Sequence, residues 1–240
     1  ANGEVLVCRV GDTFEVTDRI AVSAGRLAGL SFTHDGSAAI VALRDENGAA
    51  VLDVSGTEVT LSPQRISTGV SPYVVDVDAV GRWAVIGNVG WGGKGIRGGD
   101  SVADADSFTL VDVSQRPFRA VQHVAVPSIP EGVALSPDGR WVAALCMAGC
   151  QLPPGAPGHQ PNGRLQLFEV SDAGVRQVAD LSAGAAAQGV VFTDDGRHVV
   201  AQFYADECLA LFEVAQGTLL DTGIRVPVNG GPAGLSAAPR

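Results

Sequence analysis

Apolar and polar residues alternate along most of the chain, in short runs separated by turn residues. The stretch PEGVALSPDGRWVAAL at 130–145 is typical: an alternating apolar run, a tight turn containing Asp-Gly, and a second apolar run. Alternation with a period of two predicts a strand with one buried face, and glycine in a tight turn accepts a positive φ. The stretch therefore predicts a β-hairpin, and the chain shows no helical periodicity.

Two patterns recur in the same order along the chain. The hairpin occurs at 27–43, 73–88, 130–145 and 187–203, and GPAGLSAAPR at 231–240 repeats its first strand alone. Apolar residues that close on an acidic residue and valine follow at 49–54, 108–113, 165–170 and 209–214, and 5–10 fits with Arg9 at the acidic position. A more polar strand comes after each of these. One unit is thus four short antiparallel strands in about 45 residues, which is the period of a propeller blade.

The repeats predict an all-β fold, a single β-propeller domain over 1–240 with about five four-stranded blades, one of them incomplete. A β-sandwich also has many short strands, but not copies of two patterns in a fixed order. The predicted blade segments are about 1–25 joined by 231–240, then 26–65, 66–127, 128–183 and 184–230. The ring is either five-bladed and closed by this split blade, or a portion of a seven-bladed ring. In the second case the missing blades come from an absent part of the same chain or from another chain.

The quoted stretch, together with NGRLQLFEV at 162–170 and GGPAGLS at 230–236, resembles the YVTN-type β-propeller repeat proteins, a group that includes lactonase-like propellers. The resemblance covers the whole chain, but it is carried by turn and core residues. It implies a seven-bladed ring, about two N-terminal blades beyond this chain, and a periplasmic or secreted location. The catalytic residues of that family cannot be matched here by position, so the resemblance transfers no active site.

Charge narrows the classes of partner. The chain has 16 Lys and Arg against 26 Asp and Glu, for a net charge of −10. Nucleic acids and anionic membranes attract cationic surfaces, so we expect no nucleic-acid partner. The apolar runs are too short to cross a bilayer, so we expect no membrane span.

Two long insertions are the best candidates for a functional surface. They are GWGGKGIRGGDSVADADS at 90–107 and MAGCQLPPGAPGHQPNG at 147–163. Both connect the second and third strands of a blade, and the two blades are adjacent. The insertions should therefore lie side by side over one mouth of the central channel, and long loops in compact domains are often functional.

One variable position begins the first strand of every blade and should ring the same mouth. It is occupied by Ala28, Tyr73, Glu131, Gln188 and Ala233. Such a ring is either a solvated rim or a polar pocket in which a phenol, a carboxylate and an amide converge. The predicted ligand-binding residues are Tyr73, Trp91, Lys94, Arg97, Glu131, His159 and Gln188, and Glu131 is the candidate for catalysis.

The sequence predicts neither a cofactor nor a metal. The glycine-rich insertion lacks the spacing of a phosphate-binding loop, although Lys94 and Arg97 are available to clamp an anion. Asp100, Asp104 and Asp106 do not follow the calcium-loop pattern. His159 alone among the four histidines falls on the proposed binding face, and one histidine does not make a metal site.

The four cysteines suggest structure rather than catalysis. Cys150 could form a disulfide with Cys208 or with Cys146, or all three could stay free. Cys8 stands where other blades have phenylalanine, which predicts a small buried core residue. No base is apparent beside any cysteine, and no G-x-S-x-G motif marks a nucleophilic serine.

Two functions follow from these observations. The favoured one is an exported, non-enzymatic binding or scaffold protein that presents 90–107 and 147–163 to an unidentified protein or small molecule. The alternative is a lactonase- or cycloisomerase-like enzyme acting on a small carboxylated substrate at the channel mouth. In that case Glu131 is the base, with Tyr73, Gln188, Lys94 and Arg97 around the substrate.

Overall fold

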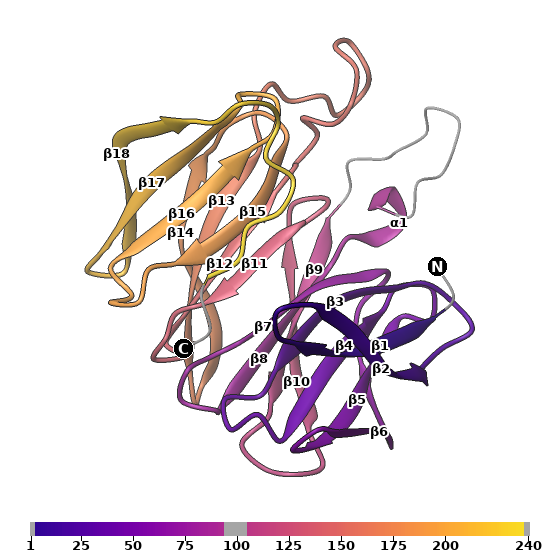
Figure 1. Cartoon of the computed structure of the whole chain (residues 1–240). Helices are drawn as coiled ribbons and strands as arrows, with labels where there is room; N and C mark the ends of the chain where they lie inside the picture. The colour runs from indigo at the N-terminus through magenta and orange to yellow at the C-terminus, as the bar shows by residue number, and fades with distance from the viewer. Residues whose placement is uncertain (1–2, 94–104, 238–240) are drawn as a thin grey trace.

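The computed structural model describes residues 3–93 and 105–237, which form four four-stranded antiparallel sheets, one two-stranded sheet and a single helical turn (Figure 1). The two-stranded sheet is β1 (Glu4–Val10) and β2 (Phe14–Ala21). Blade I is β3 (Leu27–Phe32), β4 (Ala38–Leu43), β5 (Gly48–Ser55) and β6 (Glu58–Ser67). Blade II is β7 (Pro72–Val77), β8 (Trp83–Asn88), β9 (Asp106–Asp112) and β10 (Arg119–Val126), with α1 (Gly90–Gly93) after β8. Blade III is β11 (Gly132–Leu135), β12 (Trp141–Cys146), β13 (Arg164–Ser171) and β14 (Gly174–Ser182), and blade IV is β15 (Ala187–Phe192), β16 (His198–Phe203), β17 (Cys208–Ala215) and β18 (Thr218–Pro227).

The sheets follow one another around an axis, as the blades of a propeller do. In each complete blade the four strands pair in chain order, and the first strand lies innermost. The innermost strands contact their successors, β3 against β7, β7 against β11 and β11 against β15. This arrangement confirms the predicted all-β propeller. Among the described residues, no helix is long and apolar enough to cross a membrane.

The hydrophobic core lies between the blades rather than in one central mass. All six residues of β4 and all six of β12 are buried, because the second strand of a blade is covered on both faces. Between blades II and III, the rings of Phe108 and Phe168 meet edge to face with their centroids 5.1 Å apart. Each pair of adjacent blades is thus joined by a separate apolar layer, which we call a seam. The seam holds the first strands of the two blades at a fixed spacing.

Polar side chains fix the hairpin turns at the channel end opposite the insertions. The hydroxyl of Ser136 accepts the N–H of Trp141 at 2.9 Å and donates to the Asp138 carboxylate at 2.6 Å. In blade II a single carboxylate replaces this pair: Asp78 accepts the N–H groups of Arg82 and Trp83, each at 2.9 Å. The turns are therefore rigid scaffold.

Glycine allows the first strands of neighbouring blades to approach closely around the axis. A Cβ atom on Gly132 would lie 2.5 Å from the carbonyl oxygen of Gln188, and one on Gly29 would lie 2.7 Å from the carbonyl oxygen of Tyr73. Both distances are shorter than any real carbon contact. The narrow channel thus depends on the missing side chains at these two positions.

Substituting Gly132 with alanine is expected to destabilise the propeller by about 1–3 kcal/mol, because β11 and β15 must move apart. Chemical denaturation of the variant and of the unsubstituted protein measures this difference. Gly11→Ala is the control, because a methyl group there meets no atom within 4 Å. Equal stability of the two variants would contradict the close-approach argument.

The described residues do not form the split blade, which is one of the two ring arrangements that the sequence left open. Residues 231–237 form no strand, and β1 and β2 pair only with each other. The segment instead runs beside β15, where a methyl group on Gly189 would lie 2.8 Å from the Cβ of Leu235. Its GGPAG sequence has low strand propensity, and it has no second strand to pair with.

All four cysteines are free thiols, which is one of the alternatives that the sequence left open for Cys146, Cys150 and Cys208. For Cys8 the structure corrects the prediction of a buried core residue. Cys146 is fully buried in β12, and burial raises the pKa of its thiol well above the ordinary value. Cys8 is only half-buried, because the sheet of β1 and β2 lacks the two inner strands that would cover it.

Candidate functional site

A cavity of about 370 Å³ opens at one end of the channel, and we call it the mouth cavity. All five residues that the repeat alignment placed around the mouth line it: Ala28, Tyr73, Glu131, Gln188 and Ala233. Glycines and valines of the first strands, together with Gln202 and Leu235, also line it. The structure therefore brings Tyr73, Glu131 and Gln188 together, and whether they bind a ligand stays a prediction.

Glu131 is held at the mouth by a tight backbone turn. Ile129 adopts a positive φ of 55°, and the N–H of Glu131 donates to the Ile129 carbonyl at 2.9 Å. The side chain of Ile129 is buried in a small apolar cluster with Val89, Met147, Tyr73 and Cys150. Val89 and Met147 stand at the bases of the two insertions, so these bases meet beside the mouth cavity.

Two charged groups, the Glu131 carboxylate and the Arg44 guanidinium, act on each other at the mouth cavity. Partial burial raises the pKa of Glu131 above its ordinary value, and the positive charge of Arg44 opposes that rise. The Arg44 guanidinium stacks over the Tyr73 ring, 4.7 Å from its centroid. Among the described residues, no hydrogen bond to the Glu131 carboxylate lowers its pKa, so this carboxylate is available to a water molecule or a ligand.

Two residues of this site escaped the sequence analysis. Arg44 directly follows β4, in a short turn that carries no sequence motif. Gln202 lies in β16, where the equivalent positions of the other blades hold Ala42, Gly87 and Leu145. A lone amide among small and apolar residues was a signal in the repeat alignment that could have identified Gln202.

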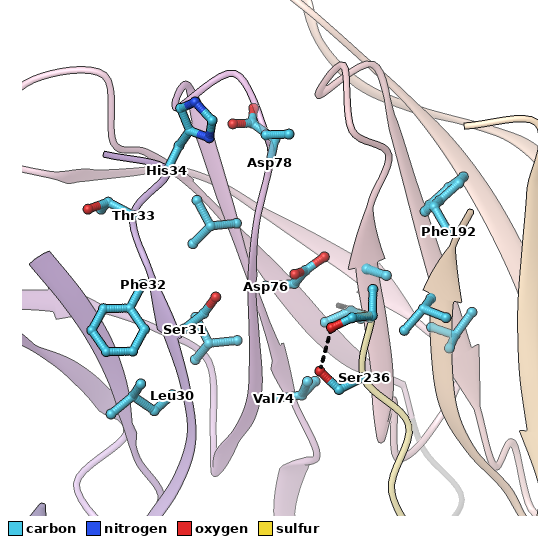
Figure 2. Close-up of a pocket in the computed structure, with 18 of the residues that line it drawn as sticks. Leu30, Ser31, Phe32, Thr33, His34, Val74, Asp76, Asp78, Phe192 and Ser236 are labelled. Atoms are coloured by element: carbon cyan, nitrogen blue, oxygen red, sulfur yellow. Dashed lines mark hydrogen bonds between the residues drawn. The ribbon is translucent and has the colours of Figure 1, made fainter. Parts of the chain in front are cut away.

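A second cavity, of about 550 Å³, continues along the channel, and we call it the axial cavity (Figure 2). It shares Val74, Val133, Val190 and Leu235 with the mouth cavity. Figure 2 shows the His34 ring and the Asp78 carboxylate at one end of it, with Asp76 nearer the middle.

The carboxylates of the axial cavity are tied to the backbone. Asp76 accepts the N–H of Leu135 at 2.8 Å, which links the adjacent inner strands of blades II and III along the channel wall. Asp78 caps its own hairpin, and burial raises the pKa of its carboxyl group. The axial cavity is therefore part of the scaffold, and within the described ranges no group of three or more His, Cys, Asp or Glu side chains is placed to hold a metal ion.

The described parts of the two insertions lie on the predicted face, but Trp91 and His159 do not line the mouth cavity. α1 and the loop 147–163 project from the same end of the molecule in Figure 1. Trp91 is 60% exposed in α1, and the Nδ1 atom of His159 lies 2.9 Å from the Leu152 carbonyl oxygen of its own loop. Asp106 accepts the N–H of Ile129 at 2.7 Å. Lys94, Arg97, Asp100 and Asp104 lie outside the described residues.

The fold and site define a β-propeller with an axial channel and a half-buried glutamate at its mouth. The chain is similar in structure to a protein from Bacteroides uniformis named a "putative 6-phosphogluconolactonase", with a TM-score of 0.71 and 13% identity over 95% of this chain. A protein of the same name from Bacteroides fragilis gives a TM-score of 0.72 and 16% identity, also over 95%. A protein of unknown function from Desulfotomaculum acetoxidans gives 0.67 and 15% over 92%.

These likenesses establish the fold, and the chain spans 66% of the length of each Bacteroides protein and 62% of the Desulfotomaculum protein. Searches of protein-family models and of curated proteins found no match. The preference for a non-enzymatic binding or scaffold protein is nevertheless corrected. Two of the solved structures with this fold are named as putative lactonases, not as binding or scaffold proteins.

Proposed function

We propose that this propeller carries a lactonase-like active site, which hydrolyses a small lactone in the mouth cavity with Glu131 as the general base. The observation that carries the proposal is the half-buried Glu131 carboxylate, with its raised pKa, in a cavity at the channel mouth. The lactonase names of two solved structures with this fold support it. A cavity of this size is at the lower end of the range for small-molecule sites, which favours a compact substrate.

The proposed reaction adds one water molecule across the ester bond of the ring. Glu131 takes a proton from the water as its oxygen bonds to the lactone carbonyl carbon. The positive charge of Arg44 and the amide N–H of Gln188 stabilise the negative charge that develops on the carbonyl oxygen. The bond between that carbon and the ring oxygen then breaks, and the proton returns from Glu131 to the departing oxygen. The product is an open-chain hydroxy acid.

The test is an assay of lactone hydrolysis with the purified chain, using γ- and δ-lactones and following proton release between pH 4 and 8. The base must be ionised, so the rate should rise with pH through the pKa of Glu131. Because burial raises that pKa, the midpoint should lie above the value of about 4.3 that is usual for glutamate. Hydrolysis no faster than with heat-denatured protein at every pH would overturn the proposed function.

Three further expectations from the sequence stand as proposals. We propose a YVTN-type repeat and a periplasmic or secreted location, on the strength of the motifs that resemble that family. We also propose that further blades, from the same polypeptide or from another chain, cover the exposed apolar side chains of β1 and β2, such as Val10 and Phe14. Cell fractionation of the natural host tests the location, and the intact mass of the natural protein tests whether further blades belong to the same polypeptide.

A further inference from the structure

We infer that Gln202 is a specificity-determining residue of the mouth cavity, and that it selects a ring that carries a free hydroxyl group. This inference rests on the proposed function for the reaction, but it concerns what the cavity recognises. It assigns a role to a side chain that the proposed hydrolysis does not use.

The amide of Gln202 is buried without a partner. The residue is 1% exposed and lines the mouth cavity, and neither its Nε2 nor its Oε1 atom makes a hydrogen bond with a residue that the structure describes. Leaving both ends of a buried amide unpaired is costly, so proteins seldom do so without a purpose.

The scaffold does not require an amide at this position. Strand register places Ala42, Gly87 and Leu145 at the equivalent positions of the other blades. Those three blades form the same four-stranded sheets with no polar atom there. Gln202 is therefore a local departure from the repeat, and it occurs in the wall of the cavity that holds Glu131.

Gly189 leaves the space that the side-chain amide of Gln202 occupies. A methyl group on Gly189 would lie 2.8 Å from Cδ of Gln202 and 3.0 Å from its Nε2. Gly189 lines the mouth cavity beside Gln188. The missing side chain thus lets the amide pack directly against the β15 backbone at the cavity wall.

The two unpaired atoms define the chemistry of the group that would satisfy them. Nε2 is a donor and Oε1 is an acceptor. A carboxylate or phosphate satisfies the donor alone, and an ammonium group satisfies the acceptor alone. A neutral group that both donates and accepts satisfies the two atoms together, and on a lactone ring the simplest such substituent is a hydroxyl group.

Binding of two unreactive rings tests the inference by titration calorimetry. The probes are 1,5-anhydro-D-glucitol, which keeps its ring hydroxyls, and tetrahydropyran, which has none. The protein is expected to bind the hydroxylated ring more tightly, and Gln202→Leu should weaken that binding by roughly tenfold or more without changing the binding of tetrahydropyran. Gln166→Leu is the control, because Gln166 is also buried with an unpaired Oε1 but does not line the mouth cavity.

Two further variants keep the result interpretable. Gln202→Met preserves volume and is measured if the leucine variant fails to fold. Gly189→Ala leaves Gln202 in place but displaces its amide, and it should weaken binding of the hydroxylated ring in the same way.

The outcomes separate this inference from the proposed reaction. Equal binding of the hydroxylated ring by the Gln202 variants and the unsubstituted protein would overturn the inference, as would failure of the unsubstituted protein to bind that ring. Binding that depends on Gln202 in a protein that hydrolyses no lactone would support the inference and overturn the proposed function alone.

Discussion

Replacing Glu131 by glutamine is expected to lower kcat for lactone hydrolysis by about 10²–10⁴-fold, which is the usual contribution of a general base. Glutamine keeps the shape and the hydrogen-bonding capacity of the side chain, but it cannot take a proton from water. Binding of the lactone ring should persist, because Gln188, Gln202 and Tyr73 still line the cavity. KM should therefore change far less than kcat, and steady-state kinetics at several pH values measure both.

The same variant should be at least as stable as the unsubstituted protein at pH 7. Burial raises the pKa of Glu131, so the folded protein binds this proton more tightly than the unfolded chain does, and ionising the group at neutral pH reduces stability. Glutamine removes that cost, and the difference in Tm should vanish below about pH 4, where the carboxyl is protonated in both states. If Glu131→Gln keeps kcat within threefold of the unsubstituted protein, Glu131 is not the general base.

Truncating Phe168 to alanine should destabilise the propeller by about 3–5 kcal/mol. Its ring is buried between blades II and III and meets Phe108 edge to face, so the substitution leaves a cavity in that seam. A loss of this size is a large part of the stability of an ordinary domain. The seam also positions β11, so a folded variant should show altered activity at the mouth.

Urea denaturation measures the effect of the Phe168 substitution. Val80→Ala is the control, because Val80 is 60% exposed in the turn that follows β7 and its loss should change stability by less than about 0.5 kcal/mol. Similar losses in the two variants would show that the seams between blades do not hold the fold together.

The repeat made the fold and the ring of mouth residues predictable. Each blade repeats the same register, so one alignment places Tyr73, Glu131 and Gln188 at the same height around the axis. Arg44 and Gln202 were harder to foresee. Each joins the site through its neighbours, the Tyr73 ring in one case and Gly189 in the other, and these contacts depend on how adjacent blades pack.

The repeat pattern did not predict the positions of side chains in the two insertions or the conformation of residues 231–237. Trp91 and His159 lie in loops that no repeat constrains, and their positions depend on contacts within each loop. The stretch at 231–237 resembles a first strand, but strand pairing is not local. Without a second strand beside it, the stretch stays irregular along β15.

The same repeat position faces the mouth cavity in the first strand of each complete blade and once more in the segment 231–237. Ala28 and Ala233 present little more than a methyl group there, whereas Tyr73, Glu131 and Gln188 present larger polar side chains. Single substitutions at the two alanines would therefore change the group that the cavity presents to a ligand, while the three polar side chains stay in place.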